Sequence, residues 1–489
     1  MKTATSPARK RSKSLTDRGG NSVPHTKIVC TIGPASESPE VIRAMIKGGM
    51  NVARLNFSHG NHREHKKKIQ VIRSVSNELS HPVAILQDLA GPKIRVGILP
   101  EPGVRLEPGQ TFTLTSQDVE GTRDRVSVSY LSLPEEVEPG DRILLSDGSI
   151  ELVVQGKSQF EVYCEVVTGG LLTSHKGLNL PTGTIRTPSF TETDREDLLF
   201  GLENGVDFVA LSFVRTAEDI LRVKEVIRQR KGDVPVIAKI ERHEALDYID
   251  SIIEETDGIM VARGDLGVEI PLEDVPVIQK MLIHKANAAG KPVITATQML
   301  RSMENSPRPT RAEAADVANA VLDGTDAVML SEETATGDYP VQAVQFMARI
   351  IKSAEKNFFH ERYLQLLPKK EVPDSVAHAA CVLANHLDAS AIVAPTLSGK
   401  TAMHISRFRP QQPIIALSPS GDVVRRLTLF WGCLPYLVPE PTDTDDMIES
   451  SAQLVLKTGY VSKKDLVIMT AGHPVGVAGT TNMVRVKRL

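Results

Sequence analysis

Cysteine is scarce in this chain of 489 residues, which carries four of them: Cys30, Cys164, Cys381 and Cys433. They lie far apart and form no C-x-x-C pair, so the sequence predicts neither a zinc site nor a disulfide framework. Cysteines without such pairing are typical of a reducing compartment, and we expect a cytoplasmic protein.

Long apolar runs and an excess of one charge are also missing. No apolar run approaches the roughly 18 residues that a membrane span needs, so we expect no membrane partner. The formal net charge is −3, which does not favour a nucleic-acid partner. The composition is otherwise that of a globular protein, and a chain of this length indicates about three domains.

The first residues differ from the rest of the chain. Residues 1–24 are basic, rich in Ser and Thr and nearly free of apolar residues. This composition is typical of a disordered tail, the interpretation we favour, and it is shared by organelle transit peptides. No apolar face is visible in the segment, which weakens the second interpretation.

After Pro24, short β-branched runs alternate with helical stretches, as in parallel βα units. Eight such units predict a closed (β/α)₈ barrel, because a doubly wound open sheet rarely needs so many strands. The runs are residues 27–32, 51–57, 83–89, 207–213, 235–241, 258–264, 292–298 and 326–332.

The chain between Asp88 and Asp207 is far too long for one βα loop. Much of it alternates apolar and polar residues between Pro and Gly, which predicts a small antiparallel β-barrel domain inserted over residues 93–188. Such an insert at the mouth of a barrel is placed to act as a lid. The barrel itself then comprises residues 25–92 and 189–355, and residues 356–489 predict a C-terminal open α/β domain.

Polar residues gather where the predicted barrel strands end. The carboxyl ends of barrel strands and the loops after them form the active site in barrels of this kind. One such residue alone is most simply a surface charge, but the set converges on one rim. Its members are Arg54, Asn56, Ser58, His59, Asp88, Lys93, Arg95, Lys239, Glu241, Arg263, Asp265, Thr295, Thr297, Gln298, Ser331, Glu332 and Glu333.

These residue types fit phosphoryl transfer. Glu241 and Asp265 follow neighbouring strands, and Mg²⁺ is typically held by one or two carboxylates and substrate oxygens. Arg54, Arg95 and Lys239 supply cations, and this reaction depends on positioning and on stabilising negative charge. No G-x-x-x-x-G-K-[ST] loop follows a barrel strand, so a P-loop is not expected.

Several strings are similar to motifs of the pyruvate kinase family, and the resemblance runs from about residue 25 to the C-terminus. They include NVARLNFSHG (51–60), LQDLAGPKIR (86–95), IAKIER (237–242), IMVARGDLGVEIP (259–271) and ITATQMLRSM (294–303), in the order of the family. The strings around Lys239–Glu241 and MVARGDLGVEIP are the most specific. The family's plan of barrel, inserted β domain and C-terminal α/β domain matches the one above.

The resemblance implies a kinase that transfers the phosphoryl group of phosphoenolpyruvate to ADP in glycolysis. It implies that Arg54 and Lys239 hold the phosphoryl group and that Glu241 and Asp265 ligate Mg²⁺ or Mn²⁺. The substrate carboxylate would lie against Ala262, Arg263, Gly264, Asp265 and Thr297. Protonation of the enolate would involve Thr297, Ser331 and Glu333. The nucleotide, ADP or ATP, would face Asn56, His59, Arg95 and Lys176.

Two positions depart from the family in the same direction. Many members bind K⁺ through residues that match Asn56, Ser58, Asp88 and position 89. They carry Glu where this chain has Lys93, and usually Thr where it has Leu89. The ammonium of Lys93 would replace the ion near Asp88, so we predict activity without K⁺.

The C-terminal domain holds SGKTA (398–402) between a predicted strand and helix. This is either a capped helix start or a phosphate cradle. The resemblance shifts the interpretation towards a sugar-phosphate effector site formed by Thr396, Ser398, Gly399, Lys400 and Thr401, in an allosterically regulated homotetramer.

Two other functions remain open from the sequence. A Mg²⁺-dependent barrel lyase or aldolase acting on pyruvate enolate would share the rim residues but would not need Lys176 for a nucleotide. A catalytically inactive regulator is disfavoured, because Arg54, Lys239, Glu241, Asp265 and Thr297 are all present.

Overall fold

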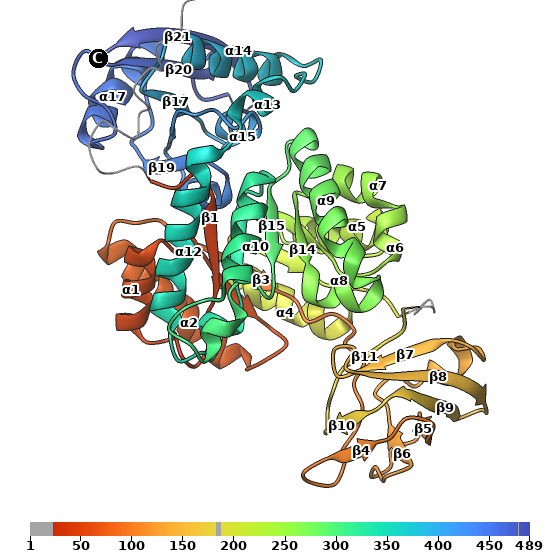
Figure 1. Ribbon diagram of the computed structural model, residues 1–489. Helices are drawn as coiled ribbons and strands as arrows, with labels where there is room; N and C mark the ends of the chain where they lie inside the picture. Colours follow the sequence, from red (N-terminus) through yellow and green to blue (C-terminus); the bar gives the residue numbers. More distant parts are fainter. Residues whose placement is uncertain (1–22, 182–186, 478) are drawn as a thin grey trace, which may run out of the picture. The chain divides into compact units, whose positions relative to one another are not determined.

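The computed structural model describes residues 23–181, 187–477 and 479–489 (Figure 1). The predicted basic tail falls almost wholly on residues 1–22, which lie outside the described residues. The described residues form two compact units, one within residues 26–347 together with 428–431, the other within residues 23–25, 348–427 and 432–489. We call them the barrel unit and the C-terminal unit.

Eight parallel strands close into a barrel in the order β1-β16-β15-β14-β13-β12-β3-β2, which confirms the predicted fold class. Each predicted run contains one of these strands. Their bounds are β1 Lys27–Thr31, β2 Val52–Asn56, β3 Ala84–Asp88, β12 Phe208–Leu211, β13 Val236–Ile240, β14 Gly258–Ala262, β15 Val293–Ala296 and β16 Ala327–Leu330. Nearly every residue in them is buried, as expected for parallel strands covered on both faces.

The helices around the barrel begin and end at recognisable caps. The side chain of Ser38 accepts a hydrogen bond from the amide of Val41 at the start of α1, and Gly49 ends that helix with φ 121°. The helices and short turns of this unit are α1 Pro39–Gly48, α2 His62–Glu78, α4 Glu192–Glu203, α5 Ala217–Gln229, α6 Glu244–Asp247, α7 Ile249–Glu255, α8 Arg263–Glu269, η2 Leu272–Asp274, α9 Val275–Ala289, η3 Arg301–Glu304, α10 Arg311–Leu322, α11 Glu332–Ala335 and α12 Pro340–Ala354.

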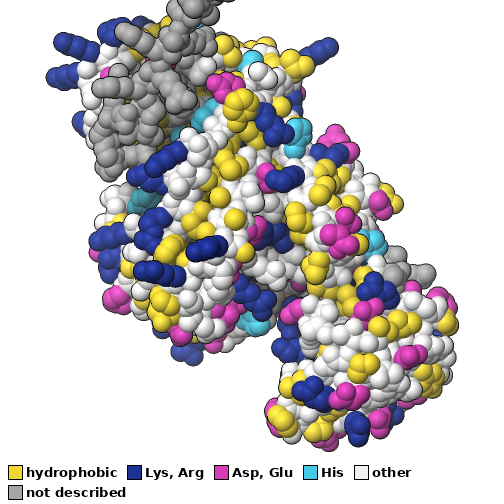
Figure 2. Space-filling view, in the orientation of Figure 1, with side chains coloured by type: hydrophobic (Ala, Val, Ile, Leu, Met, Phe, Trp, Pro, Cys, Tyr) yellow, Lys and Arg dark blue, Asp and Glu magenta, His cyan; other side chains and the backbone are white. Residues whose placement is uncertain are grey.

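The insert between β3 and β12 contains a six-stranded sheet, β11-β7-β8-β9-β5-β6, and a two-stranded sheet, β10-β4. Its strands are antiparallel except for β5 and β6, which pair in parallel, so the predicted antiparallel pattern fails at that pair. The bounds are β4 Val104–Leu106, β5 Thr111–Thr115, β6 Arg125–Ser127, α3 Leu133–Glu136, β7 Arg142–Leu145, β8 Ile150–Lys157, β9 Glu161–Thr168, β10 Gly170–Leu172 and β11 Leu178–Asn179. Basic and acidic side chains are interspersed over this part of the surface (Figure 2).

The C-terminal unit is built on a five-stranded sheet, β19-β18-β17-β20-β21, in which only β21 runs antiparallel to its neighbour. This confirms the predicted open α/β domain. Its elements are η4 Glu355–Asn357, α13 His360–Leu364, α14 Val372–His386, β17 Ala391–Pro395, α15 Lys400–Arg407, β18 Ile414–Ser418, α16 Gly421–Arg426, η5 Leu427–Leu429, β19 Cys433–Leu437, α17 Thr444–Lys457, β20 Leu466–Gly472 and β21 Thr481–Arg488. None of the described helices combines the length and apolar character needed to cross a membrane.

Candidate active site

The ammonium of Lys239 lies at the centre of the polar rim. Lys239 is the fourth residue of β13, so its side chain emerges near the carboxyl end of the barrel. Its Nζ donates to Ser212 Oγ at 2.7 Å and lies 2.8 Å from Glu241 Oε1 and 3.2 Å from Asp88 Oδ1. The side chain is about nine-tenths buried, so these partners replace the water that a lysine normally keeps.

Arg54 shares Asp88 with Lys239. Its Nε donates to Asp88 Oδ2 at 2.6 Å, and its Nη1 donates to Thr31 Oγ1 at 2.9 Å. Asp88 is fully buried. Each oxygen of the Asp88 carboxylate therefore pairs with one cation. The shared negative charge offsets the repulsion between Arg54 and Lys239.

The charges of this cluster set its protonation. Burial raises the pKa of Asp88, but the charges of Lys239 and Arg54 outweigh it, so the net pKa is lowered. Burial alone would lower the pKa of Lys239, but the carboxylates of Asp88 and Glu241 outweigh it and raise that pKa well above its usual value. Both groups are thus held in their charged forms at neutral pH.

Glu241 and Asp265 form the acidic side of the rim. Glu241 is buried, and its Oε2 accepts the amide of Phe213 at 2.8 Å. Burial and then the charge of Asp265 raise the pKa of Glu241 against the opposing effect of Lys239. Two neighbouring carboxylates whose repulsion raises a pKa are a donor set that a divalent cation would relieve, so these residues fit Mg²⁺ or Mn²⁺.

Thr297 lies on a strained turn that faces α8. Thr297 and Gln298 both have positive φ, 66° and 56°, which is uncommon for residues other than glycine and most unusual for the β-branched Thr297. Thr297 Oγ1 accepts the amide of Gly264 at 2.7 Å. The guanidinium of Arg263 holds the turn from outside, donating to the carbonyls of Ala296 at 3.2 Å and Thr297 at 2.6 Å. The Arg263 side chain and the Gly264 amide are therefore both engaged in holding this turn.

Ser331 and Glu333 follow β16 and are both buried. The amide of Ser331 donates to Glu333 Oε2 at 2.6 Å, and the amide of Leu300 donates to Glu333 Oε1 at 3.0 Å. Burial raises the pKa of Glu333 despite these hydrogen bonds. The Ser331 hydroxyl is buried and has no protein hydrogen-bond partner. A carboxyl group whose pKa is raised and a hydroxyl without a protein partner can thus serve a proton transfer.

The residues predicted to face a nucleotide come from two parts of the barrel unit. Asn56 Oδ1 accepts the amide of Ser58 at 3.2 Å, and Arg95 Nη1 donates to the carbonyl of His175 at 3.0 Å. Burial first, then the charges of Arg95, Lys93 and Arg54, lower the pKa of the exposed His59. His59 therefore lies in a cationic field, which suits polyphosphate binding. Lys176 is exposed, and its carbonyl accepts the amide of Val96 at 2.9 Å.

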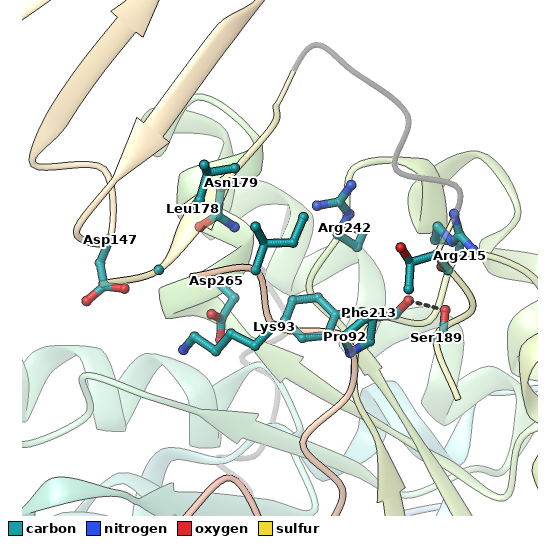
Figure 3. Close-up of a pocket in the computed structure, with 13 residues that line it drawn as sticks. Pro92, Lys93, Asp147, Leu178, Asn179, Ser189, Phe213, Arg215, Arg242 and Asp265 are labelled. Atoms are coloured by element: carbon teal, nitrogen blue, oxygen red, sulfur yellow. Dashed lines mark hydrogen bonds between the residues drawn. The ribbon is translucent and has the colours of Figure 1, made fainter. Parts of the chain in front are cut away.

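A small cavity lies beside these groups. It is lined by Lys93, Asp147, Asn179, Arg242 and Asp265, among others (Figure 3). Lys93 is exposed and points along this cavity, whereas the two oxygens of Asp88 are taken by Arg54 and Lys239. The predicted placement of the Lys93 ammonium against Asp88 is therefore not a direct ion pair in this structure.

The C-terminal unit contains a larger cavity of about 340 Å³, lined by Thr396, Ser398 and Thr401 among others. Thr396 Oγ1 accepts the amide of Gly399 at 3.0 Å, where Gly399 has φ 84°. The hydroxyls of Thr401 and Thr481 lie 2.6 Å apart. Lys400 starts α15 and is exposed. Of the five predicted effector residues, Thr396, Ser398 and Thr401 thus line the cavity, and Gly399 lies in the turn that is hydrogen-bonded to Thr396.

Sequence reasoning missed three contributors to the rim. Thr31 ends β1 and supports Arg54, while Ser212 and Phe213 follow β12 and contact Lys239 and Glu241. The position of Ser212 directly after a barrel strand is the same signal that identified the other rim residues. A cluster of His243, Glu244 and Glu269 was also missed, although Arg242 already neutralises it, donating to Glu269 Oε1 at 2.9 Å.

A closed barrel whose rim combines buried cations with a carboxylate pair defines a metal-dependent enzyme of anionic substrates. Comparison with known proteins narrows this class. The family model described as "Pyruvate kinase, barrel domain" matches residues 23–344, and "Pyruvate kinase, alpha/beta domain" matches residues 374–487.

Proteins named pyruvate kinase are similar in sequence to this chain along nearly its whole length. "Pyruvate kinase 2" of Synechocystis sp. is 49% identical over 466 residues, which cover 94% of this chain and 79% of that protein. "Pyruvate kinase" of Clostridium acetobutylicum is 46% identical over 467 residues, 94% of this chain and 99% of that one. "Pyruvate kinase" of Geobacillus stearothermophilus is 47% identical over 467 residues, 94% and 80% respectively. The chain belongs to the pyruvate kinase family.

Proposed function

We propose that the protein transfers the phosphoryl group of phosphoenolpyruvate to ADP, giving pyruvate and ATP. The observation that carries the proposal is the placement of Lys239 between Asp88 and Glu241, with Arg54 on the far side of Asp88. Two buried cations converge there beside a carboxylate pair. A phosphoryl group entering this space would meet positive charge that is already oriented, which is the main requirement of this reaction.

Glu241 and Asp265 would hold the divalent metal, Mg²⁺ or Mn²⁺. When bound, the metal supplies positive charge that polarises the oxygens of the substrate. Lys239 Nζ lies 2.8 Å from Glu241 Oε1. The ammonium and a metal held by the carboxylate pair would therefore act on the same oxygens of the substrate. The ammonium stays protonated and stabilises negative charge without giving up its proton, because its pKa is raised by Asp88 and Glu241 against the effect of burial.

The remaining rim residues orient the substrate and deliver a proton. The backbone of Ala262, Arg263, Gly264 and Asp265 and the Thr297 hydroxyl would hold the carboxylate of phosphoenolpyruvate. Glu333, whose pKa is raised by burial, and the Ser331 hydroxyl would relay a proton towards the enolate carbon. Thr297 would pass on that proton.

Asn56, His59, Arg95 and Lys176 would face the phosphates of the nucleotide. Arg95 lies near the start and Lys176 near the end of the insert, residues 93–188. Movement of the insert would therefore bring two cations to the nucleotide and exclude water from the rim.

A coupled assay tests the proposal. Pyruvate release from phosphoenolpyruvate, followed with lactate dehydrogenase, should require both ADP and Mg²⁺. Release of pyruvate or its enolate products at the same rate without ADP would contradict the kinase function and favour a lyase.

We also propose that activity does not require K⁺. Leu89 is buried and offers no side-chain oxygen to an ion, and Asp88 already carries the charges of Arg54 and Lys239. Lys93 adds a further positive charge near the rim, where relatives carry Glu. In a buffer free of Na⁺ and NH₄⁺, the rate should change less than about twofold between no K⁺ and saturating K⁺. A steep K⁺ requirement would overturn this proposal.

Regulation, assembly and location are part of the same proposal. The cavity of the C-terminal unit is a binding site for a phosphorylated metabolite at Thr396, Ser398, Gly399, Lys400 and Thr401. The enzyme works as a homotetramer in the cytoplasm, where its glycolytic substrates are found. Light scattering tests the assembly, and a panel of sugar phosphates in the coupled assay tests the regulation.

A further inference from the structure

The turn after β12, residues 212–215, contacts the side chain of Lys239 in β13 and that of Glu241, which directly follows this strand. Ser212 Oγ accepts a hydrogen bond from Lys239 Nζ at 2.7 Å. The next residue, Phe213, donates its amide to Glu241 Oε2 at 2.8 Å. One short turn therefore fixes the ammonium and the carboxylate on which the proposed function rests.

The same turn receives the first linker of the insert. Ser212 Oγ donates to the carbonyl of Leu89 at 2.7 Å. Gly91, with φ 66°, packs directly against the turn, since a Cβ at this position would lie 2.7 Å from Phe213 Cδ2 and 3.1 Å from Ser212 Cβ. Only glycine allows the linker to pass so close with this backbone conformation.

The second linker reaches the turn from the other side. Ser189 is buried, and its Oγ donates to the carbonyl of Phe213 at 2.6 Å (Figure 3). Arg215 Nη2 donates to the carbonyl of Thr187 at 2.9 Å. Both connections between barrel and insert are thus hydrogen-bonded to the turn that holds Lys239 and Glu241.

Phe213 adopts a conformation that needs such support. Its φ is 55°, in the left-handed region that a bulky residue rarely adopts because the conformation is strained. The Ser189 hydroxyl holds the carbonyl of this residue while Glu241 holds its amide. Loss of the Ser189 bond would free the 213–214 peptide, and relaxation of φ at Phe213 would then turn the N–H of the preceding peptide away from Glu241.

We propose that the 212–215 turn couples the position of the insert to the geometry of Lys239 and Glu241, and that Ser189 is the positioning residue of this coupling. Ser189 acts through Phe213 and does not itself reach the substrate. The inference rests on the proposed function only in naming Lys239 and Glu241 as catalytic groups. The structural claim is that the Ser189 hydroxyl in the linker orients the carboxylate of Glu241. This claim can be tested without measuring enzyme activity.

The test compares Ser189→Ala with Ser76→Ala in the full chain. Ser76 is an equally suitable buried serine of the barrel unit, since its Oγ also donates to a carbonyl at 2.6 Å, that of His81 at the end of α2. Each variant loses one hydrogen bond, so both should lower the melting temperature by a similar amount. Only Ser189→Ala should affect the site.

Two readouts without substrate carry the test. Mn²⁺ binding, measured by electron paramagnetic resonance, should weaken about tenfold in Ser189→Ala, the usual size of an effect on a ligand's supporting group. Hydrogen exchange in a peptide spanning residues 208–216 should speed up in the same variant. In the coupled assay kcat should fall about tenfold while KM for ADP stays unchanged.

Wild-type Mn²⁺ affinity and wild-type exchange in Ser189→Ala would overturn the inference, as would an equal loss of Mn²⁺ binding in Ser76→Ala. If the wild type instead releases no pyruvate, the proposed function fails, but the Mn²⁺ and exchange results still decide whether Ser189 orients Glu241.

Discussion

The rim of the barrel and the cavity of the C-terminal unit present polar groups to a ligand in opposite ways. At the rim, Lys239 and Arg54 are buried and already paired with Asp88 and Glu241. In the cavity, the polar groups are mostly hydroxyls, and among the described residues that line it Lys457 is the one with a cationic side chain.

This difference has energetic consequences. Buried charges are tolerated only with partners, so removing one rim charge leaves another uncompensated and costs several kcal/mol. Hydroxyls lose little when a neighbour changes, because they rotate to another partner or to water. A single substitution at the rim should therefore abolish most of the activity, whereas a single substitution in the cavity should change ligand affinity only by a limited factor.

The largest effect is expected at the centre of the rim. Lys239→Met should lower kcat by on the order of 10²–10³-fold, because it removes the ammonium that we propose stabilises the transferring phosphoryl group. It should also lower the free energy of unfolding by about 3–5 kcal/mol, because Asp88 and Glu241 lose a shared cation. The coupled assay and chemical denaturation measure the two effects.

The control for this prediction is Lys224→Met. Lys224 belongs to α5 and pairs with Asp257 at 3.0 Å, away from the rim. Turnover of this variant should equal that of the wild type. Mn²⁺ binding should persist in Lys239→Met, since Glu241 and Asp265 remain. Full turnover of Lys239→Met would refute the role assigned to this lysine.

Acid should affect the two units differently, because His65 of the barrel unit and Asp374 of the C-terminal unit contribute to stability over different pH ranges. Burial lowers the pKa of His65, next to the rim, from 6.5 to about 4. Its Nε2 faces the carbonyl of His59 at 3.0 Å and its Nδ1 is buried without a partner, so a protonated ring would carry an unsatisfied N–H. The neutral ring stabilises the fold above pH 6.5, and this contribution is lost as the pH falls towards 4.

Asp374 of the C-terminal unit behaves differently. Burial raises its pKa, but hydrogen bonds from His404 and Lys369 and the charge of Arg407 lower it to about 2. Its contribution is present above its usual pKa of 3.8 and is lost only as the pH falls through about 2. Between pH 6.5 and 4 the contribution of His65 should therefore be lost before that of Asp374.

Hydrogen exchange of each unit between pH 7 and 4 measures this prediction. His65→Gln, which keeps a donor for the His59 carbonyl, should remove up to about 1.4 kcal/mol per pH unit of the barrel unit's pH dependence. His378→Gln is matched, since its ring also lies 2.9 Å from a backbone carbonyl, that of Leu364. An unchanged slope in His65→Gln would show that other groups control the acid response.

The rim was predictable from the sequence because barrel topology brings every strand end to one place. Lys239, Asp88 and Glu241 lie near or directly after the carboxyl ends of strands and are too polar for a core, so their convergence followed from the barrel prediction. The pairing was not predictable. Asp88 reaches Lys239 because β3 pairs with β12 across the whole insert, in the register Phe208↔Leu86, which no local pattern specifies.

Short or ordinary-looking elements escaped the same reasoning. Ser212 and Phe213 resemble the end of a buried strand, and their importance depends on a positive φ that only the structure shows. The strands β4, β10 and β11 have 3, 3 and 2 residues, too few for an alternating pattern to be recognised.

The smallest effect is expected in the cavity of the C-terminal unit. Thr396→Val keeps the side chain's shape but removes the hydroxyl that accepts the Gly399 amide and faces the cavity. Half-activation by the most effective sugar phosphate of a panel should then need about tenfold more ligand, the equivalent of one hydrogen bond of about 1.4 kcal/mol.

Thr470→Val is the matched control, because its hydroxyl donates to the Met483 carbonyl at 2.9 Å within the same sheet but does not line the cavity. An activation curve that shifts equally in both variants would mean that the sheet, and not the cavity, sets the response. Complete loss of activation from this single hydroxyl would instead show that the cavity is as all-or-none as the rim, and the contrast between the two regions would fail.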